Sequence, residues 1–296
     1  MNKILHSNFR KPAVNIGRIS YMNVAPIYYG LDNGMKPSWI NMVSAPPSTL
    51  NRMLAHGELD ISPVSSAAFA RNQDEWLLLP GLSIACFGEV MSVILVSKYP
   101  FEQLADKKVI LTEESATAVE LLKLLFVLQG VVPHFETGKI RNADDFSEDA
   151  AAALVIGDAA LKEKWGSHFD YVWDLGKMWW ELTGLPFVFA LWAVRKSFAD
   201  EKPELVSSII DLFHISRDAG CMNINKIIPR ASEKLELRTD ICRKYYDKLH
   251  FDLDLPEIKG AEAFFEGLFN QRIIQKKAQL SFFDYEQSMY ATSHAA

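Results

Sequence analysis

The sequence predicts an α/β protein whose mixed, mostly parallel sheets form two lobes with a cleft between them. Within residues 14–71, an apolar strand, a few small polar residues and the start of a helix follow one another three times. This alternation is typical of a mostly parallel sheet. A second block of strands and helices lies between 91 and 194, and the chain has a helical pattern from Lys202 onward. Two such blocks followed by a helical region favour two lobes.

The first block begins with a strand over residues 14–19, where apolar and polar residues alternate. Pro26 follows at a position where a helix can begin, because proline is tolerated in the first helical turn. Later in this block we expect strands over 39–44, 59–64 and 77–84, and helices over 50–55 and from 67 onward.

The strongest helix signal of the second block lies between Ser115, which can cap a helix, and Gly130, which can close one. Around this helix we expect strands over 91–96, 109–111, 135–137, 153–158 and 187–194, a helix or the approach to one over 144–153, and a helix over 159–165. A long aromatic segment begins at 171–175. In the C-terminal region we expect helical segments over 205–217, 232–249 and 259–275, and a frayed tail over 289–296.

Size and charge limit the classes of function. A chain of 296 residues, 49% of them apolar, can fill the core of one large domain or two medium ones. The net charge is −6 and no basic run occurs, so we expect no nucleic-acid partner. No apolar stretch reaches the roughly 18 residues of a membrane span, so we expect no membrane partner. Residues 1–12 lack the apolar segment of a secretory signal, which predicts a cytoplasmic protein.

Motifs of metal and cofactor chemistry are absent from the sequence. It contains no Gly-x-Ser-x-Gly elbow, no His-x-x-x-His or Cys-x-x-Cys pair, and no glycine-rich phosphate loop. Cys86, Cys221 and Cys242 form neither a metal-ligand pattern nor an even disulfide set. We therefore expect a protein that works without a metal or a cofactor.

Small polar residues gather where the expected strands end and helices begin. In open α/β sheets ligands bind at the carboxyl ends of strands, and the amide groups of a helix start suit an anion. The alternative for Ser20, Asn23, Ser115 and Asp158 is a structural role as helix caps. The neutral candidates are Ser20, Tyr21, Asn23, Ser65, Ser66, Ser92, Thr112, Ser115, Thr117 and Thr183.

Taken in order, several of these segments resemble the chorismate dehydratase family of the futalosine route to menaquinone. The matching segments are ISYMNVAP at 19–26, LDISPVSS at 59–66, GEVMSV at 88–93, SAT at 115–117, IGDAAL at 156–161, and the stretch from DLG at 174–176 to TGLPFVFA at 183–190. Each segment alone is a weak signal, but their order and spacing are specific.

This resemblance implies a two-lobed fold of the periplasmic binding protein type II kind, with the ligand in the cleft. Together with the pattern above, it predicts a first lobe from residues 1–97 and 190–296 and a second lobe from 98–189. Near residue 115 the family pattern is expected to read Ser-x-Thr-Ser, and this chain has Ala118 in the last place. That difference removes one possible hydroxyl from an anion site.

The implied activity is loss of water from chorismate, a small-molecule substrate, giving 3-[(1-carboxyvinyl)oxy]benzoate. On this resemblance we expect Asn23 to polarise or hold the substrate and Ser92 to assist the departing hydroxyl. The matching motifs offer no protein base, so the substrate's own side-chain carboxylate is the expected proton acceptor. The residues expected to bind substrate are Ser20, Tyr21, Ser65, Ser66, Thr112, Ser115, Ala116, Thr117, Asp158, Thr183 and Gly184.

Two alternatives stay open at this point. One is a non-catalytic binding or sensing protein, because a fold does not fix a function. The other is the related 1,4-dihydroxy-6-naphthoate synthase, which typically carries a His-Ser-Pro-Asp type start where this chain has Ser20-Tyr21-Met22-Asn23. The sequence gives no oligomeric state.

Overall fold

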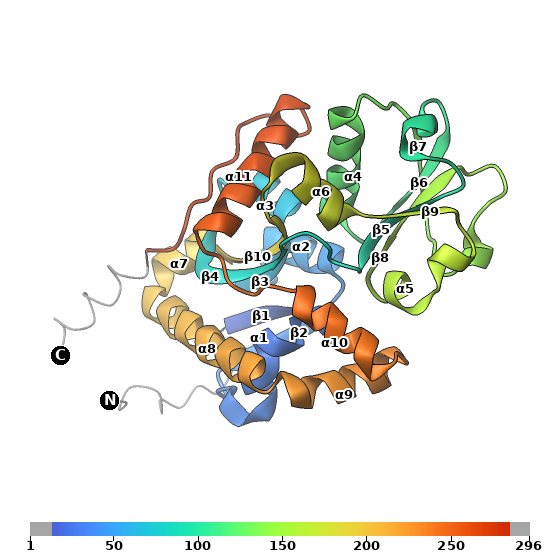
Figure 1. Cartoon of the computed structure of the whole chain (residues 1–296). Coiled ribbons are helices and arrows are strands. Elements are labelled where there is room, and N and C mark those ends of the chain that lie inside the picture. The colour runs from blue at the N-terminus through green and yellow to red at the C-terminus, as the bar shows by residue number, and fades with distance from the viewer. Residues whose placement is uncertain (1–13, 285–296) are drawn as a thin grey trace, which may run out of the picture.

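The computed structural model describes residues 14–284. It contains two five-stranded sheets, one built from the first part of the chain and a returning strand, and the other from the middle of the chain (Figure 1). The predicted α/β class with two sheets is therefore confirmed. The expectations for residues 1–12 and for 289–296 lie outside the described residues.

The first sheet has the strand order β2-β1-β3-β10-β4. β1 is parallel to β2 and β3, whereas β10 is antiparallel to β3 and β4. Because parallel strands end at the same edge of a sheet, the turns after β1 and β3 emerge side by side. The elements are β1 (Val14–Ile19), α1 (Ala25–Gly30), β2 (Ile40–Ala45), α2 (Pro47–Ala55), β3 (Ile61–Ser65), α3 (Ser66–Asn72), β4 (Trp76–Cys86) and β10 (Phe187–Arg195).

The second sheet has the order β7-β6-β8-β5-β9 and repeats the same plan. β6 is parallel to β7 and β8, and β5 is antiparallel to β8 and β9. In both sheets, therefore, the antiparallel strand is the one that the chain enters when it crosses from the other sheet. The elements are β5 (Val93–Ser97), β6 (Lys108–Thr112), α4 (Ala116–Leu128), β7 (His134–Gly138), β8 (Ala152–Ile156), α5 (Gly157–Lys162), β9 (Tyr171–Asp174) and α6 (Leu175–Thr183).

The division between the sheets differs from the lobe limits that the sequence predicts. Residues 93–97 form β5 of the second sheet, although the sequence assigns everything up to residue 97 to the first lobe. The chain crosses in the segment 87–92 and returns after α6 in the segment 184–186. The apolar run of β5 marks a buried strand, and periodicity does not tell which sheet such a strand joins.

The C-terminal region is helical, as the sequence predicts, with different limits. Pro229 lies inside α9, so the sequence pattern hides the first part of that helix. The expected segment 232–249 is broken at Glu236, whose backbone is left-handed. Residues 144–153 hold only a short 3-10 turn, Ala143–Asp145, and no helix. The helices are α7 (Lys196–Glu201), α8 (Pro203–Met222), α9 (Ile224–Leu235), α10 (Thr239–Lys248) and α11 (Leu255–Asn270).

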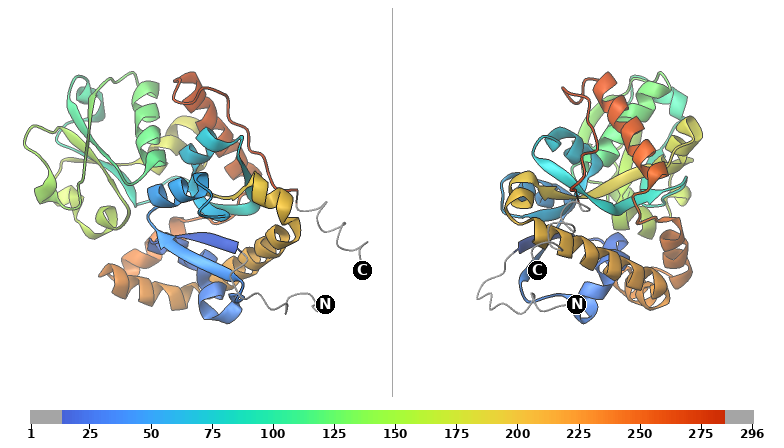
Figure 2. Two further views of the ribbon diagram at one scale, coloured as in Figure 1. Left: turned by 180° about the vertical axis from the view of Figure 1, so that it is seen from behind. Right: turned by 90° about the vertical axis from the view of Figure 1, so that its left-hand side faces the viewer.

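Helices α8 to α10 lie beside the first sheet on the side of α1 (Figure 2), and the turn between α9 and α10 reaches the second lobe, where Glu236 lies 3.6 Å from Lys162 of α5. Gly220 allows α8 to approach α1 closely, because a Cβ at that position would lie 2.0 Å from the Pro26 carbonyl oxygen. This packing brings the end of α10 back towards the first turn of the chain. No helix within the described residues is long and apolar enough to cross a membrane.

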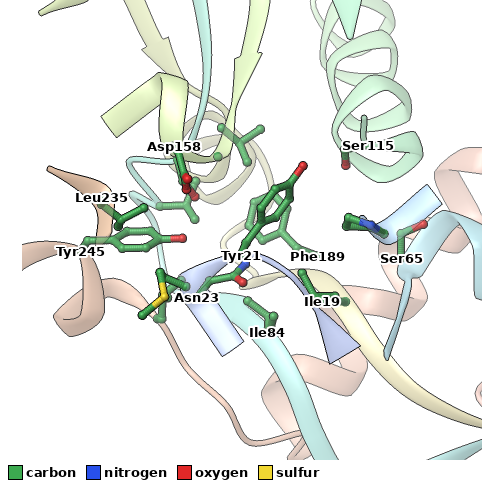
Figure 3. A pocket seen from close by; sticks show the side chains of 18 residues that line it. Ile19, Tyr21, Asn23, Ser65, Ile84, Ser115, Asp158, Phe189, Leu235 and Tyr245 are labelled. Carbon is green, nitrogen blue, oxygen red and sulfur yellow. The ribbon is translucent and has the colours of Figure 1, made fainter. Parts of the chain in front are cut away.

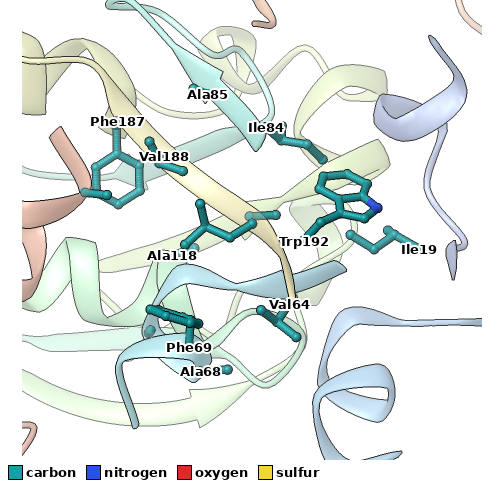
Figure 4. Close-up of a cluster of buried hydrophobic side chains, with 14 of the residues drawn as sticks. Ile19, Val64, Ala68, Phe69, Ile84, Ala85, Ala118, Phe187, Val188 and Trp192 are labelled. Carbon is teal, nitrogen blue, oxygen red and sulfur yellow. The ribbon is translucent and has the colours of Figure 1, made fainter. Parts of the chain in front are cut away.

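Helix α4 connects the hydrophobic cores of the two sheets. Its residue Ala118 is fully buried and lies near Phe69 of α3 in one cluster with side chains of β10 (Figure 4). The Thr117 hydroxyl accepts a 2.9 Å hydrogen bond from the Ala67 amide, and Arg71 forms a 2.6 Å ion pair with Glu120. The two lobes are therefore packed against each other along α3 and α4.

Candidate active site

A partly open cavity lies where the parallel strands of both sheets end. Figure 3 shows Asp158 and Ser115 on one side of it and Asn23 and Ile84 on the other. The polar residues of its wall are Tyr21, Asn23, Ser65, Ser92, Ser115, Asp158 and Tyr245. The other lining residues are Ile19, Met22, Pro47, Ile84, Val90, Val93, Gly157, Phe189, Ala190, Leu235 and Leu249.

The turn after β1 presents Tyr21 and Asn23 to this cavity. A short 3-10 turn, Met22–Val24, redirects the chain into α1, and the Tyr246 hydroxyl of α10 donates a 2.7 Å hydrogen bond to the Met22 carbonyl oxygen. Asn23 Oδ1 is buried and has no hydrogen-bond partner in the structure. A buried acceptor without a partner is costly, so this oxygen is suited to a donor on a ligand.

Ser92 lies directly before β5 and is only 6% exposed. Its carbonyl oxygen accepts a 2.7 Å hydrogen bond from the Gly157 amide, which fixes it beside the start of α5. Burial raises the pKa of Tyr245, and a side-chain hydrogen bond with Ser92 acts in the opposite direction. The Tyr245 phenol is therefore protonated at neutral pH and lies next to the Ser92 hydroxyl.

Three helices begin at the cavity wall. The Ser65 hydroxyl caps α3 by accepting from the Ala68 amide at 3.3 Å, and Ser115 caps α4 by accepting from Ala118 at 3.2 Å. Helix α5 begins at Gly157, whose φ of +62° suits a residue without a side chain. A capping serine keeps its own O–H for another acceptor. The wall thus offers two hydroxyl donors and the partial positive charge of helix starts.

Among the lining residues between positions 14 and 284, Asp158 is the only charged one. Burial raises its pKa, and the positive charges of Lys162 and Lys234 oppose that effect. An adjoining hollow shares Tyr21, Gly157 and Asp158 with the cavity and adds the charged residues Glu114, Arg141 and Lys162. Between residues 14 and 284, no group of three or more His, Cys, Asp and Glu side chains is placed to hold a metal.

Several predicted site residues do not line the cavity, because their polar groups serve the fold. The Ser66 hydroxyl donates to the Val188 carbonyl oxygen at 2.6 Å, and the Thr117 hydroxyl accepts a hydrogen bond from the Ala67 amide. The Thr112 hydroxyl accepts from the Glu114 amide at 3.1 Å. Ser20 is exposed and Ala116 lies in the first turn of α4. Thr183 and Gly184 close the C-terminal end of α6, where the Thr183 hydroxyl donates to Trp179 at 2.7 Å.

The structure brings together six of the predicted site residues and adds others that the sequence does not single out. The six are Tyr21, Asn23, Ser65, Ser92, Ser115 and Asp158. Tyr245 and Leu249 are added by the end of α10, and no sequence signal marks them, because no motif surrounds them. Ala118 faces the core, so the hydroxyl that this position lacks would not have lined the cavity.

Comparisons with known sequences agree with one another. Residues 14–270 match the model of a family described as menaquinone biosynthesis. The chain is 31% identical to chorismate dehydratase of Thermus thermophilus, over 86% of this chain and 94% of that protein. It is 30% identical to chorismate dehydratase of Campylobacter jejuni, over 70% of this chain and 84% of that protein. It is also 28% identical to 1,4-dihydroxy-6-naphtoate synthase of T. thermophilus, over 64% of this chain and 68% of that protein.

Comparisons with solved structures identify the fold. Protein AF1704 of Archaeoglobus fulgidus superposes with a TM-score of 0.70 at 19% identity, over 90% of this chain and 100% of that one. The periplasmic aliphatic sulphonate binding protein SsuA of Escherichia coli superposes with a TM-score of 0.60 at 14% identity, over 90% of each chain. The predicted fold of the periplasmic binding protein kind is thereby confirmed.

Proposed function

The chain belongs to the menaquinone biosynthesis family, and we propose that it is a chorismate dehydratase, which eliminates water from chorismate to give 3-[(1-carboxyvinyl)oxy]benzoate. The family resemblance seen in the sequence is confirmed by this membership. The T. thermophilus and C. jejuni relatives, at 31% and 30% identity, both carry the name chorismate dehydratase. The reaction breaks a carbon–oxygen bond, so the proposed enzyme class is a hydro-lyase.

The observation that best supports this proposal is the unpartnered, buried oxygen of Asn23 in the cavity wall. At neutral pH chorismate carries two carboxylates, and its ring hydroxyl is the only O–H donor that it has. Asn23 Oδ1 accepts this hydroxyl and so fixes the group that leaves. The Ser92 hydroxyl donates to the same oxygen and stabilises the negative charge that develops as it departs.

The two carboxylates of the substrate are bound without a cation in the cavity wall. The hydroxyls of Ser65 and Ser115 donate to them, and the starts of α3, α4 and α5 supply partial positive charge. Thr117, which the sequence offers as a further donor, takes no part, because its side chain is buried between the lobes and does not line the cavity. Asp158 faces the same space and disfavours a wrongly oriented carboxylate.

The chemistry requires little from the protein beyond orientation. Removal of the ring proton beside the enol ether gives a carbanion whose charge is conjugated through the ring double bond to the ring carboxylate. Loss of hydroxide from the next carbon then makes the ring aromatic. The substrate's side-chain carboxylate takes the proton, and Asp158, the one charged side chain among the lining residues that the structure describes, acts only against a wrongly oriented substrate. Neutral donors in a closed cleft hold the reacting geometry.

Incubation of the purified protein with chorismate tests the proposal. We expect the cyclohexadiene absorption to disappear and one equivalent of the aromatic product to form, as identified by chromatography and mass. Binding of chorismate without conversion would instead support a binding or sensing protein. Conversion of the cyclic futalosine-derived substrate, with chorismate unchanged, would support the naphthoate synthase.

The roles of Asn23 and Ser92 need a separate test with the variants Asn23→Ala and Ser92→Ala. Removing one hydrogen-bonding group that stabilises developing charge commonly lowers turnover by about 100- to 1,000-fold, and we expect losses in this range. Near-normal kcat in both variants, with circular dichroism unchanged, would remove the assignment while leaving the proposed reaction intact.

The predicted cytoplasmic location is part of this proposal and is tested separately from the activity. Fractionation of cells that express the full chain, with detection by an antibody, is expected to place the protein with cytoplasmic markers. Recovery with periplasmic markers would support a solute-binding protein.

A further inference from the structure

The segment that carries Ser92 is held by a single carboxylate from β9, the strand next to β5 in the second sheet, where Asp174 lies opposite Ile94. Asp174 Oδ2 accepts hydrogen bonds from the Met91 amide at 2.6 Å and from the Val90 amide at 3.0 Å. Asp174 Oδ1 lies 3.1 Å from the same Val90 nitrogen. These contacts join positions more than eighty residues apart in the chain, immediately before Ser92.

Met91 adopts a backbone conformation that its side chain disfavours. Its φ is +65°, in the left-handed region that non-glycine residues rarely adopt. A residue in this region keeps the conformation only when its surroundings enforce it. The short bond from the Met91 amide to Asp174 supplies that restraint, and the next residue, Ser92, then points its side chain into the cavity wall.

Asp174 is itself firmly placed. It ends β9 and caps α6 by accepting from the Lys177 amide at 3.0 Å. The next turn packs closely on the crossing segment, since a Cβ on Gly176 would lie 2.6 Å from the Gly88 carbonyl oxygen and 2.6 Å from Cys86 Sγ. The start of α6 and the segment 87–92 therefore form one rigid unit.

A helix cap alone does not explain these contacts. Capping α6 needs only the bond from Lys177, and the Ser65 and Ser115 side chains cap their helices with one such bond each. The bonds to Val90 and Met91 are additional, and they join a half-buried carboxylate to two backbone amides. Their effect is on the geometry of the segment before Ser92.

We infer that Asp174 is a positioning residue for catalysis, which acts by holding Met91 in its left-handed conformation and thereby placing the Ser92 hydroxyl at the reacting centre. This inference rests on the proposed role of Ser92 in the dehydration of chorismate. It adds a residue that touches neither the cavity nor the substrate to the set on which turnover depends.

The first test compares the wild type with Asp174→Asn and Asp174→Ser. The amide nitrogen of asparagine cannot accept, and the single hydroxyl of serine still caps α6 but does not reach Val90 and Met91. Because small displacements of a catalytic group are costly, we expect kcat to fall about 10- to 100-fold, with KM changed less than about threefold. Asp254→Ala, which removes the N-cap side chain of α11 away from the cavity, is the control and should lower thermal stability without lowering kcat.

The second test asks whether the effect passes through Ser92. In a Ser92→Ala background, Asp174→Asn should lower kcat by less than about twofold, because the group that it positions is absent. In a Met91→Gly background, Asp174→Asn should lower kcat by a smaller factor than it does in the wild type, because glycine adopts positive φ without the restraint from Asp174. An undiminished loss of kcat in the Ser92→Ala background, or a loss of stability alone as in Asp254→Ala, would overturn the inference.

Failure of the proposed function would look different. If the wild type leaves chorismate unchanged, the proposed reaction is wrong, and a crystal structure of Asp174→Asn still decides the inference about geometry. Movement of Met91 out of the left-handed region with displacement of Ser92 Oγ supports it. An unchanged segment 87–92 refutes it.

Discussion

The Tyr21 hydroxyl donates a 3.2 Å hydrogen bond to Glu114 Oε2, which joins the turn after β1 in the first sheet to the turn after β6 in the second. Burial raises the pKa of Tyr21, and the negative charge of Glu114 adds to that effect. The phenol therefore stays protonated and able to donate across the neutral range. Since Tyr21 also lines the cavity, this bond connects the two lobes at the site itself.

Tyr21→Phe removes this link while keeping the ring. We expect KM for chorismate to rise several-fold, because the two sides of the cavity are less firmly held, and stability to fall by about 0.5–1.5 kcal/mol. Steady-state kinetics and urea denaturation measure the two effects. Glu114→Gln is the matched control, since its amide oxygen still accepts from Tyr21 and should give a smaller change. Equal effects of the two variants would show that the bond is not the cause.

Tyr245→Phe tests the residue of α10 that lies next to Ser92. Loss of the phenol removes one partner of the Ser92 hydroxyl, and we expect kcat to fall by about tenfold, which corresponds to about 1.4 kcal/mol of transition-state stabilisation. Tyr246→Phe serves as a comparison, because that hydroxyl bonds to the Met22 carbonyl oxygen and does not line the cavity. A kcat unchanged in Tyr245→Phe would exclude the phenol from catalysis.

Asp158→Asn should change the pH dependence of both stability and binding. Because burial raises the pKa of Asp158, the folded state binds a proton more readily than the unfolded state, so stability is lost as pH rises through the folded-state pKa. The variant should therefore be more stable than the wild type at pH 7, by no more than about 1 kcal/mol because water screens this half-exposed group. The difference should vanish below the ordinary value of 3.8.

The same substitution removes the negative charge that faces an anionic substrate. We expect KM at pH 7 to fall in Asp158→Asn if both carboxylates bind near the helix starts. Thermal melts at several pH values and KM at pH 5.5 and pH 7 check these outcomes. A variant less stable than the wild type at pH 7 would show that the ionised carboxylate is favourable in the fold.

Thr117→Val separates a structural role from a binding role. The valine side chain has a similar shape but leaves the buried Ala67 amide without its acceptor, which should cost about 1–3 kcal/mol of stability. Because Thr117 does not line the cavity, KM and kcat should stay within about twofold of the wild type. Thr117→Ser keeps the hydroxyl and should recover most of the stability. A large rise in KM with stability unchanged would show instead that Thr117 binds the substrate.

The sequence predicts where the cavity lies better than it predicts which residues line it. The turn Tyr21 to Asn23 and the start of α4 could be located because strand periodicity and cap residues mark where strands end and helices begin. The hydroxyls of Ser66 and Thr117 could not be assigned in the same way, since residue type does not tell whether a backbone group of the chain takes a hydroxyl. Their roles depend on how α3 and α4 pack.

The residues that α10 contributes to the cavity could not be predicted from the sequence, for a different physical reason. Tyr245 belongs to a helix without any motif, and its approach to Ser92 depends on the packing of α8 against α1 and on the break at Glu236. Likewise the buried strand β5 has the same apolar pattern whichever sheet it joins. Such long-range packing leaves no local signature in the residues involved.

The position of α10 has a consequence for biosynthesis of the polypeptide. Both sheets can be complete once β10 has left the ribosome, yet the cavity still lacks the wall that Leu235, Tyr245 and Leu249 provide. A nascent chain therefore cannot hold its substrate in the finished geometry until α10 has been translated, and a premature stop codon ahead of that helix would yield a chain that lacks this part of the site.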